Sequence, residues 1–240
     1  MNSSGRPHLL GLLAGLFLAG GLIFSAMLIT RAWMKISESQ TISTTGSARK
    51  NVRSDLIVWQ GSFSTEAETL LEAQRRLKTD LEKVEAFLKI NGVTNFILSP
   101  IGINELRSNE QTPRRIGFHL VQTVEITSPE VDKIAKLDRD STALVEQGVF
   151  FTSSAPQYIY TRAGEAKVEM LAEASHDARL RAEQICSQGN RILGGLRSAR
   201  MGVFQITPLY STQTSSEGMN DTTALEKTVT AVVTVAFSLK

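Results

Sequence analysis

A long uncharged segment lies near the start of the chain. Residues 9–30 are 22 consecutive residues without a charged side chain, LLGLLAGLFLAGGLIFSAMLIT. A helix rises about 1.5 Å per residue, so a helix of this length spans the roughly 30 Å hydrocarbon core of a bilayer. We therefore predict a membrane anchor in residues 1–35, whose apolar span includes Leu9, Leu16, Phe17, Leu22, Ile23 and Thr30.

A cleaved signal peptide is the alternative interpretation of this segment. Such peptides have a shorter apolar region of about 7–15 residues, followed by small residues at the cleavage site. The best site here is the pair Thr30 and Ala32, which places Arg31 between them. We favour an uncleaved anchor. Its orientation stays open, because Arg6 on one side competes with Arg31 and Lys35 on the other.

Small residues recur at intervals of four within the predicted anchor, at Gly11, Gly15 and Ala19. Such a stripe lets two helix backbones approach closely and is able to drive helix association. Chance is the simpler explanation, because a Gly- and Ala-rich span of this length contains such a spacing without any function. We keep the stripe as a candidate helix-packing surface.

After a short polar linker at residues 36–40, the hydrophobic pattern predicts an α+β fold over residues 41–240. Pairs of strands separated by single helices favour three helices that cover one face of a largely antiparallel sheet. About 200 residues are enough for one domain or for two closely packed lobes. We predict strands at 41–48, 54–64, 95–106, 115–127, 149–161 (two short pieces), 192–207 and 227–239, and helices at 65–90, 128–148 and 162–188.

Several side chains mark the expected helix ends. Thr65 with Glu68 forms a capping-box pattern at the start of the helix predicted over residues 65–90, and Asn91 marks the expected end of that helix. Ser128 is the expected N-cap of the second helix, which ends near Gly148. The apolar stripe of the first helix is Leu70, Leu77, Leu81, Val84 and Leu88.

Other patterns indicate which strand faces are buried. In the second strand Ile57, Trp59 and Phe63 share one face. The last strand has Val229, Ala231, Val233, Val235, Phe237 and Leu239 on one face. The third helix is Ala-rich, which favours close packing against a sheet. We expect the 18 residues of 208–225 to form an exposed loop.

Charge is nearly balanced, with 26 basic and 24 acidic residues and a net charge of +2. Three of the bases and none of the acids lie in residues 1–35, which leaves 23 bases and 24 acids, or −1, for residues 36–240. A domain without excess cations is unsuited to neutralising phosphates, which argues against nucleic-acid binding. The 42% hydrophobic content excludes disorder throughout.

The residues typical of catalytic and metal sites are sparse. His119 and His176 have no second histidine at helical spacing, so we predict no metal site and no cofactor. Cys186 is the only cysteine and is expected to be a small buried hydrophobe. Asp138 and Asp140, two apart on a helix, point to different faces and do not form a carboxylate pair. We predict no catalytic residues.

Two small groups are candidates for an interface. Arg197 and Arg200 belong to the only local basic cluster, with Arg191, but fall on opposite faces of a regular strand. Tyr158 and Tyr160 fall on one face of an extended segment and are suited to packing at an interface. Burial of these two rings in the core is an equally good interpretation.

Several separated segments resemble the SIMPL domain family, also called DUF541. They are LGGLRSARMGVFQITP (193–208), the preceding EMLAEASHDARLRAEQI (169–185), the terminal TAVVTVAFSL (230–239), TISTTGSARKNVRSDLIVWQGSF near the start, and GVFFTSSAPQYIYT in the middle. The similarity covers about residues 41–239. It is greatest to a bacterial branch described as periplasmic or outer-membrane-associated.

The resemblance implies a mixed α/β fold, an envelope location, oligomer formation and a link to stress protection. No catalytic motif defines the family, so it supplies no active-site residues. Exported members of the family favour an amino terminus inside and a domain outside. Together with the anchor, this implies a single-pass protein of the cytoplasmic membrane with its domain in the periplasm or outside.

Three hypotheses for function follow. The first is a non-enzymatic envelope protein that self-associates as a homo-oligomer or scaffolds unidentified envelope partners. The second is a module that binds a small ligand or lipid, in a groove between helices and sheet or at the 208–225 loop. The third is an unrecognised hydrolase that depends on His119 or His176.

Overall fold

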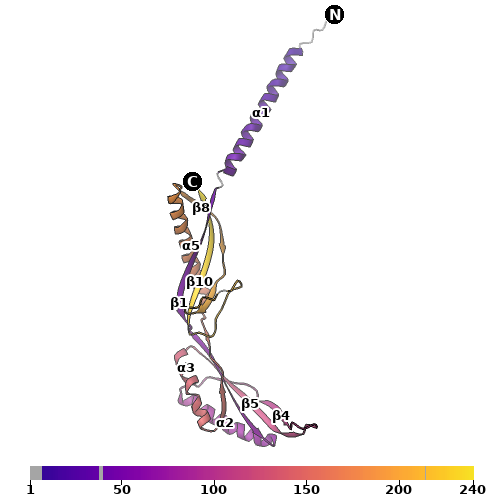
Figure 1. Cartoon of the computed structure of the whole chain (residues 1–240), viewed down its shortest axis with the longest axis vertical. Coiled ribbons are helices and arrows are strands. Elements are labelled where there is room, and N and C mark those ends of the chain that lie inside the picture. Colours follow the sequence, from indigo (N-terminus) through magenta and orange to yellow (C-terminus); the bar gives the residue numbers. More distant parts are fainter. Residues whose placement is uncertain (1–6, 38–39, 214) are drawn as a thin grey trace. The chain divides into compact units, whose positions relative to one another are not determined.

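The computed structural model describes residues 7–37, 40–213 and 215–240. Helix α1 (Pro7–Ser37) contains the whole predicted span and continues two residues past Lys35, into the predicted linker. Its segment Gly11–Met34 is long and apolar enough to cross a membrane, and no part of its most apolar window is buried inside the structure (Figure 1). This helix has the length and composition of a membrane anchor or a signal sequence. Residues 38–39 of the linker lie outside the described residues.

The chain forms two compact units. Unit 1 comprises residues 1–47, 172–202 and 232–240, and unit 2 comprises residues 48–171 and 203–231. Three elements contribute residues to both units: strands β1 (Thr41–Arg53) and β10 (Glu226–Leu239) and helix α5 (Ala163–Gln188). The predicted α+β class with antiparallel strand pairing is confirmed.

Unit 1 is a sheet in the order β1-β10-β8 with helix α5 on one face (Figure 1). Strand β8 (Leu193–Met201) pairs antiparallel with β10. The apolar face of β10 faces the core as predicted, although Leu239 is only half-buried.

The alanines of α5 allow an unusually close approach to strand β1. Ala174 and Ala178 are completely buried, and Thr44 Oγ1 donates a 2.8 Å hydrogen bond to the carbonyl oxygen of Ala178. A Cβ atom on Gly46 would lie 2.1 Å from the carbonyl oxygen of Ala174. Only glycine on the strand and small residues on the helix fit this spacing, which explains the Ala-rich composition of α5.

Unit 2 is built around the long antiparallel pair of β2 (Leu56–Ala67) and β5 (Arg115–Ser128). The strand order is β3-β5-β2-β6, with β4 beside β5 and β7 beside β2. Strand β9 (Gln205–Pro208) pairs with the first part of β10. The remaining strands are β3 (Ile97–Leu98), β4 (Gly102–Arg107), β6 (Phe150–Ser153) and β7 (Gln157–Ile159).

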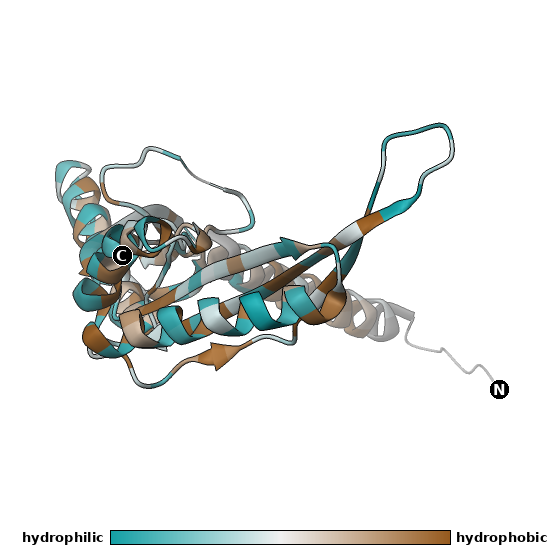
Figure 2. Cartoon of the chain, turned by 90° about the horizontal axis from the view of Figure 1, so that it is seen from below, coloured by the Kyte–Doolittle hydropathy of each residue, from teal (hydrophilic) through white to brown (hydrophobic). Residues whose placement is uncertain are grey.

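Helices α2 (Leu70–Ile90), α3 (Val131–Asp140) and α4 (Thr142–Glu146) contribute side chains to the core of unit 2. Ile57, Trp59 and Phe63 share one buried face, as predicted. The exposed side of α2 and the turn between β4 and β5 are largely hydrophilic (Figure 2). The turn connects two antiparallel strands, so β4 and β5 form a hairpin.

The predicted start of α2 is wrong. Thr65 pairs with Leu120 in the β2–β5 ladder, so it is extended rather than a helix cap. The N-cap is Thr69, whose hydroxyl accepts a hydrogen bond from the backbone N–H of Glu72. Leu70, expected in the buried stripe, is exposed. The end at Asn91 is confirmed, and Gly92 has a φ of +71°, a conformation that favours glycine.

The predicted helix of residues 128–148 is two helices, so the described residues contain four helices after α1 rather than three. Ser128 belongs to strand β5, and its hydroxyl accepts a hydrogen bond from the backbone of Glu130. Ser141 interrupts the helix: it is buried, and its hydroxyl donates to the carbonyl oxygen of Asp138. A serine that bonds the preceding turn competes with helix continuation.

Two predicted strands are also divided. The strand expected over 95–106 breaks between β3 and β4, where Pro100 lacks the N–H that a ladder requires. The strand expected over 192–207 breaks between β8 and β9, where the N–H of Gly202 donates to the carbonyl oxygen of Val232.

The 208–225 segment is the exposed loop that its length predicts only in part: Tyr210, Gln213 and Glu217 are exposed, whereas its returning half is packed. The N–H of Ser54 donates to the carbonyl oxygen of Leu225, which packs against the core of unit 2. Asp221 forms a buried ion pair with Lys227 of β10. The returning half of the segment is therefore part of the packed structure.

Candidate functional site

The residues predicted to form the membrane anchor lie on α1. Leu16, Phe17, Leu22 and Ile23 are exposed, as a lipid-facing surface requires, whereas the side chain of Leu9 lies outside the described residues. The hydroxyl of Thr30 donates to the carbonyl oxygen of Ala26 at 2.8 Å. The hydroxyl donor therefore has its hydrogen-bond partner within the helix, as a polar group in an apolar environment requires.

The small-residue stripe remains a prediction. Gly11, Gly15 and Ala19 lie on the exposed surface of α1. A Cβ atom at either glycine would meet nothing within 4 Å. The described part of the chain therefore provides no packing partner at these positions.

The two candidate tyrosines have different surroundings. Tyr158 lies on β7, and its partly buried ring packs against the core of unit 2. Tyr160 follows that strand, with the Arg162 guanidinium 5.8 Å from the centre of its ring. Packing against the core explains Tyr158 without an interface. An interface role for either ring stays a prediction.

The candidate arginines lie on strand β8, where the register is irregular. Ser198 pairs with Ala236 and Leu196 with Phe237, so Arg197 is an extra residue without a partner on β10. Arg200 pairs regularly with Thr234. The prediction that Arg197 and Arg200 lie on opposite faces assumed a regular strand, in which successive side chains alternate between faces. The bulge at Arg197 interrupts this alternation. Both arginines are exposed.

Strand β8 leaves an apolar surface uncovered. Leu196 and Met201 pair with Phe237 and Val233, two core residues of β10, and directly paired residues share one face of a sheet. Leu196 is nevertheless 62% exposed and Met201 48% exposed. The second edge of β8 has no partner strand among the described residues. Arg197 lies at the bulge beside Leu196, whereas Arg200 pairs with exposed Thr234 and lies on the other face of the sheet. We call Leu196, Met201 and Arg197 the β8 surface.

A shallow cleft of about 410 Å³ lies along α5 in unit 1. It is lined by Glu173, His176, Asp177, Leu180 and Ala172, and His176 is exposed there. The pKa of Asp177 is lowered, first by a hydrogen bond from the backbone of Ser47 and then by Arg181. The cleft therefore combines a charged helix face, on which Asp177 pairs with Arg181, with an apolar strip that includes Leu180.

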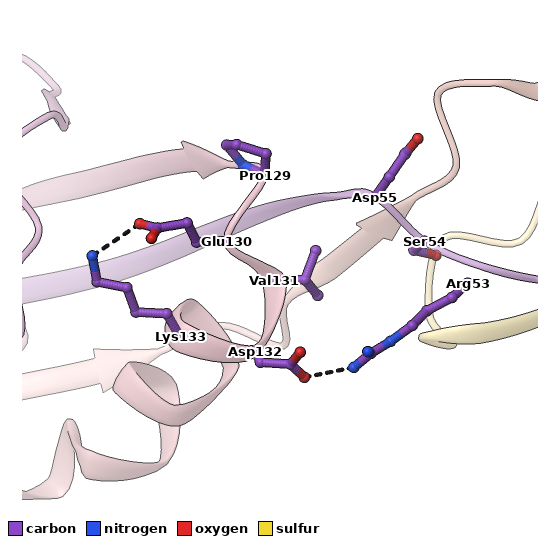
Figure 3. Close-up of a pocket in the computed structure, with 8 residues that line it drawn as sticks. All are labelled: Arg53, Ser54, Asp55, Pro129, Glu130, Val131, Asp132 and Lys133. Carbon is purple, nitrogen blue, oxygen red and sulfur yellow. Dashed lines mark hydrogen bonds and ion pairs between the residues drawn. The ribbon is translucent and has the colours of Figure 1, made fainter.

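A cavity of about 380 Å³ in unit 2 is shown in Figure 3. Its charged side chains bond one another: Arg53 lies 2.6 Å from Asp132, and Lys133 lies 2.9 Å from Glu130. Burial alone would raise the pKa of Asp55, but hydrogen bonds from Thr161 and the charge of Arg162 lower it. We interpret this cavity as a paired-charge surface.

A second polar cavity of unit 2, also of about 380 Å³, contains His119. His119 Nδ1 lies 3.3 Å from Glu66 Oε1, yet it has no hydrogen-bond partner. Arg76 and Asp80 approach from helix α2. His119 and His176 therefore lie in different cavities, so they do not form one site.

The described residues contain no group of three or more His, Cys, Asp or Glu side chains placed to hold a metal ion. Cys186 is buried, as predicted. Asp138 accepts hydrogen bonds from Trp59 Nε1 and from Ser153 Oγ, and Asp140 is not part of this group. The Trp59–Asp138–Ser153 group and the Lys227–Asp221 pair were not found from the sequence, because their partners have no recognisable spacing.

Comparison with protein families identifies one match. The model of the SIMPL family, described as a protein of unknown function (DUF541), matches residues 42–237. A comparison with curated proteins finds no match.

Proposed function

Because the chain belongs to the SIMPL family, whose function is unknown, we propose that it is a non-enzymatic envelope protein anchored by α1, whose domain self-associates outside the cytoplasm. The observation that carries this proposal is the β8 surface, on which the apolar face of a buried strand continues onto an exposed edge strand. Exposed apolar surface next to an unpaired strand edge is typical of protein interfaces.

The anchor supports a location at the cytoplasmic membrane. Helix α1 carries Arg31 near the end of its apolar segment and is uninterrupted there, which favours an intact helix over a cleavage site between Thr30 and Ala32. With the amino terminus inside, the domain lies in the periplasm or outside. A role in stress protection rests on the family resemblance alone.

Charge favours a contact between unlike surfaces of two copies. The β8 surface carries Arg197, whereas the α5 cleft carries Glu173 beside exposed Leu180. Asp177 of the same cleft is paired with Arg181 at 2.9 Å. An arginine-bearing apolar edge of one copy is complementary to an acidic apolar cleft of the next. Such a heterologous contact builds a ring when its rotation closes.

The test uses the full chain in its own membrane, with amine-reactive crosslinking followed by size measurement in nanodiscs. We expect a series of crosslinked homo-oligomers that the Leu196→Glu and Met201→Glu variants lose. The matched control is Ile103→Glu, which alters an exposed apolar residue on edge strand β4 of unit 2. A monomeric full chain, or oligomers unaffected by both β8 substitutions, would contradict the proposal.

Topology is tested separately by adding protease to spheroplasts. We expect digestion of the domain from outside while the carbonate-insoluble α1 fragment is retained. A domain that is protected until the membrane is dissolved would show the opposite orientation. Release of the intact domain into the soluble fraction would show a cleaved signal peptide.

A further inference from the structure

The cavity that contains His119 has a different chemical character from the paired-charge cavity of Figure 3. Its walls come from four parts of unit 2, so it is assembled by the tertiary fold rather than by one loop. Strand β2, helix α2, strand β5 and the region around β6 contribute Ser64, Thr65, Glu66, Arg76, Asp80, His119, Gly148 and Phe150.

Two polar groups of this cavity have unused hydrogen-bonding capacity. His119 Nδ1 is the one buried side-chain nitrogen or oxygen of the described residues that lacks a hydrogen-bond partner. The Asp80 side chain is only 14% exposed, and its carboxylate meets Lys83 Nζ at a long 3.4 Å. A largely buried polar group without a good partner is unfavourable, so a ligand that donates a hydrogen bond to the Asp80 carboxylate recovers part of that cost.

Arg76 is held in place at the same cavity. Its guanidinium donates to the carbonyl oxygen of Glu66 at 3.2 Å and to the Glu72 carboxylate at 2.6 Å. A guanidinium has five N–H donors in a fixed plane, so these two bonds orient the group and leave further donors for a ligand.

Phe150 adds an apolar surface to this polar site. It pairs with Ser64 at the end of the β2–β6 ladder, and its side chain is 72% exposed. Exposing a phenyl ring beside carboxylates and hydroxyls is unfavourable for the protein alone. The ring is therefore available to a ligand with both an apolar face and many polar groups.

The charges exclude the simpler classes of ligand. An anion would meet the carboxylates of Glu66 and Asp80, and a compact cation would meet Arg76. A neutral ligand whose groups both donate and accept hydrogen bonds suits this mixture. Sugar rings combine such hydroxyl groups with an apolar C–H face that stacks on an aromatic ring.

We propose that this cavity binds a neutral saccharide, with one sugar ring stacked on Phe150. Asp80 accepts hydrogen bonds from sugar hydroxyls, and Arg76 donates to them. A cavity of about 380 Å³ falls in the range of small-molecule sites and holds one or two sugar rings. The proposal is independent of self-association, because it uses no residue of the β8 surface.

The test measures binding of cellobiose and of N,N′-diacetylchitobiose to the full chain by calorimetry. The chain is held in nanodiscs, because maltoside detergents would compete for the site. We expect Phe150→Leu and Asp80→Asn each to weaken binding of the better ligand by about tenfold. Matched controls are Tyr210→Leu, which removes an exposed ring elsewhere, and Glu82→Gln, which neutralises an exposed carboxylate on α2.

Charged sugars provide the discriminating comparison. Glucuronate and glucosamine are expected to bind at least about tenfold more weakly than the neutral disaccharides. Absence of binding by both disaccharides at 20 mM, tighter binding of glucuronate, or unchanged affinity in both cavity variants would overturn the proposal. Thermal unfolding of each variant distinguishes a lost contact from a lost fold.

Discussion

The ammonium group of Lys227 lies 2.7 Å from the Asp221 carboxylate, with the lysine side chain completely buried and the aspartate 8% exposed. Lys227 Nζ also donates to the backbone carbonyl oxygen of Asp221 at 2.6 Å. A buried lysine is tolerated only when it is paired, so this pair holds the returning half of the 208–225 segment against β10.

Replacing Lys227 with Met removes one partner and leaves the buried Asp221 carboxylate without its cation. We expect the free energy of unfolding to fall by about 3 kcal/mol, measured by urea denaturation. The matched control is Lys50→Met, whose ion pair with Glu169 is half exposed and is expected to contribute less than about 1 kcal/mol. Equal effects of the two substitutions would show that burial does not strengthen the Lys227 pair.

Asp221 also predicts a dependence of stability on pH. Burial alone would raise its pKa, but hydrogen bonds from Lys227, Thr223 and Ala224 outweigh burial and lower it to about 2 from 3.8. A lowered folded pKa contributes stability that is present above pH 4 and lost as the pH falls towards 2. We expect a loss of roughly 2 kcal/mol over this interval. The difference in the free energy of unfolding between the wild type and Asp221→Asn should therefore become smaller as the pH falls from 4 towards 2. A difference that stays constant over this interval would contradict the lowered pKa of Asp221.

Gly46 tests the close packing of β1 on α5. The added Cβ of Gly46→Ala collides with the backbone of Ala174, so the helix must move away from the sheet. We expect a loss of about 1–3 kcal/mol or more in the free energy of unfolding. Gly195→Ala is the matched control in the same unit, since a Cβ there meets nothing within 4 Å. A tolerated Gly46→Ala would mean that the two elements separate easily.

Asp138 tests the polar group in the core of unit 2. Trp59 Nε1 donates to Asp138 Oδ1 at 2.9 Å and contacts Ser153 Oγ at 2.8 Å. We expect Asp138→Ala to lower the free energy of unfolding by about 1–3 kcal/mol, because it removes a charged acceptor from a buried indole. The matched control is Asp140→Ala, two residues further along the same helix, which should have little effect. The comparison of the two melting temperatures decides between a core role and a surface role for Asp138.

Sequence patterns predicted the parts of the fold that depend on local periodicity. The buried face of Ile57, Trp59 and Phe63 follows from strict alternation, and the buried Leu77 and Leu88 follow from helical spacing. The apolar length of α1 follows from composition alone. Each of these features is a property of one continuous segment.

The ends of elements were less predictable, because competing local signals are equivalent. Thr65 precedes Glu68 by three residues, and Thr69 precedes Glu72 by the same spacing. Both are capping patterns, and only pairing of Thr65 with Leu120 keeps the first threonine extended. Strand β5, whose Leu120 lies 55 residues further along the chain than Thr65, therefore decides which threonine caps the helix.

The candidate sites show the same limit. Arg197 and Arg200 were identified from their charge, but the bulge that changes their arrangement arises from pairing with β10. His119 was identified as a rare residue type, yet its cavity depends on Arg76, Asp80 and Phe150, which carry no shared motif.

By itself, the sequence determined a long apolar helix followed by an α+β domain, because the spacing of hydrophobic residues and the length of an apolar segment are properties of consecutive residues. Only the tertiary structure decided that Lys227 is buried against Asp221, that Gly46 lies against α5, and that His119 lacks a hydrogen-bond partner. These relationships depend on distance in space and on exclusion of water, and neither quantity exists until distant segments have packed together.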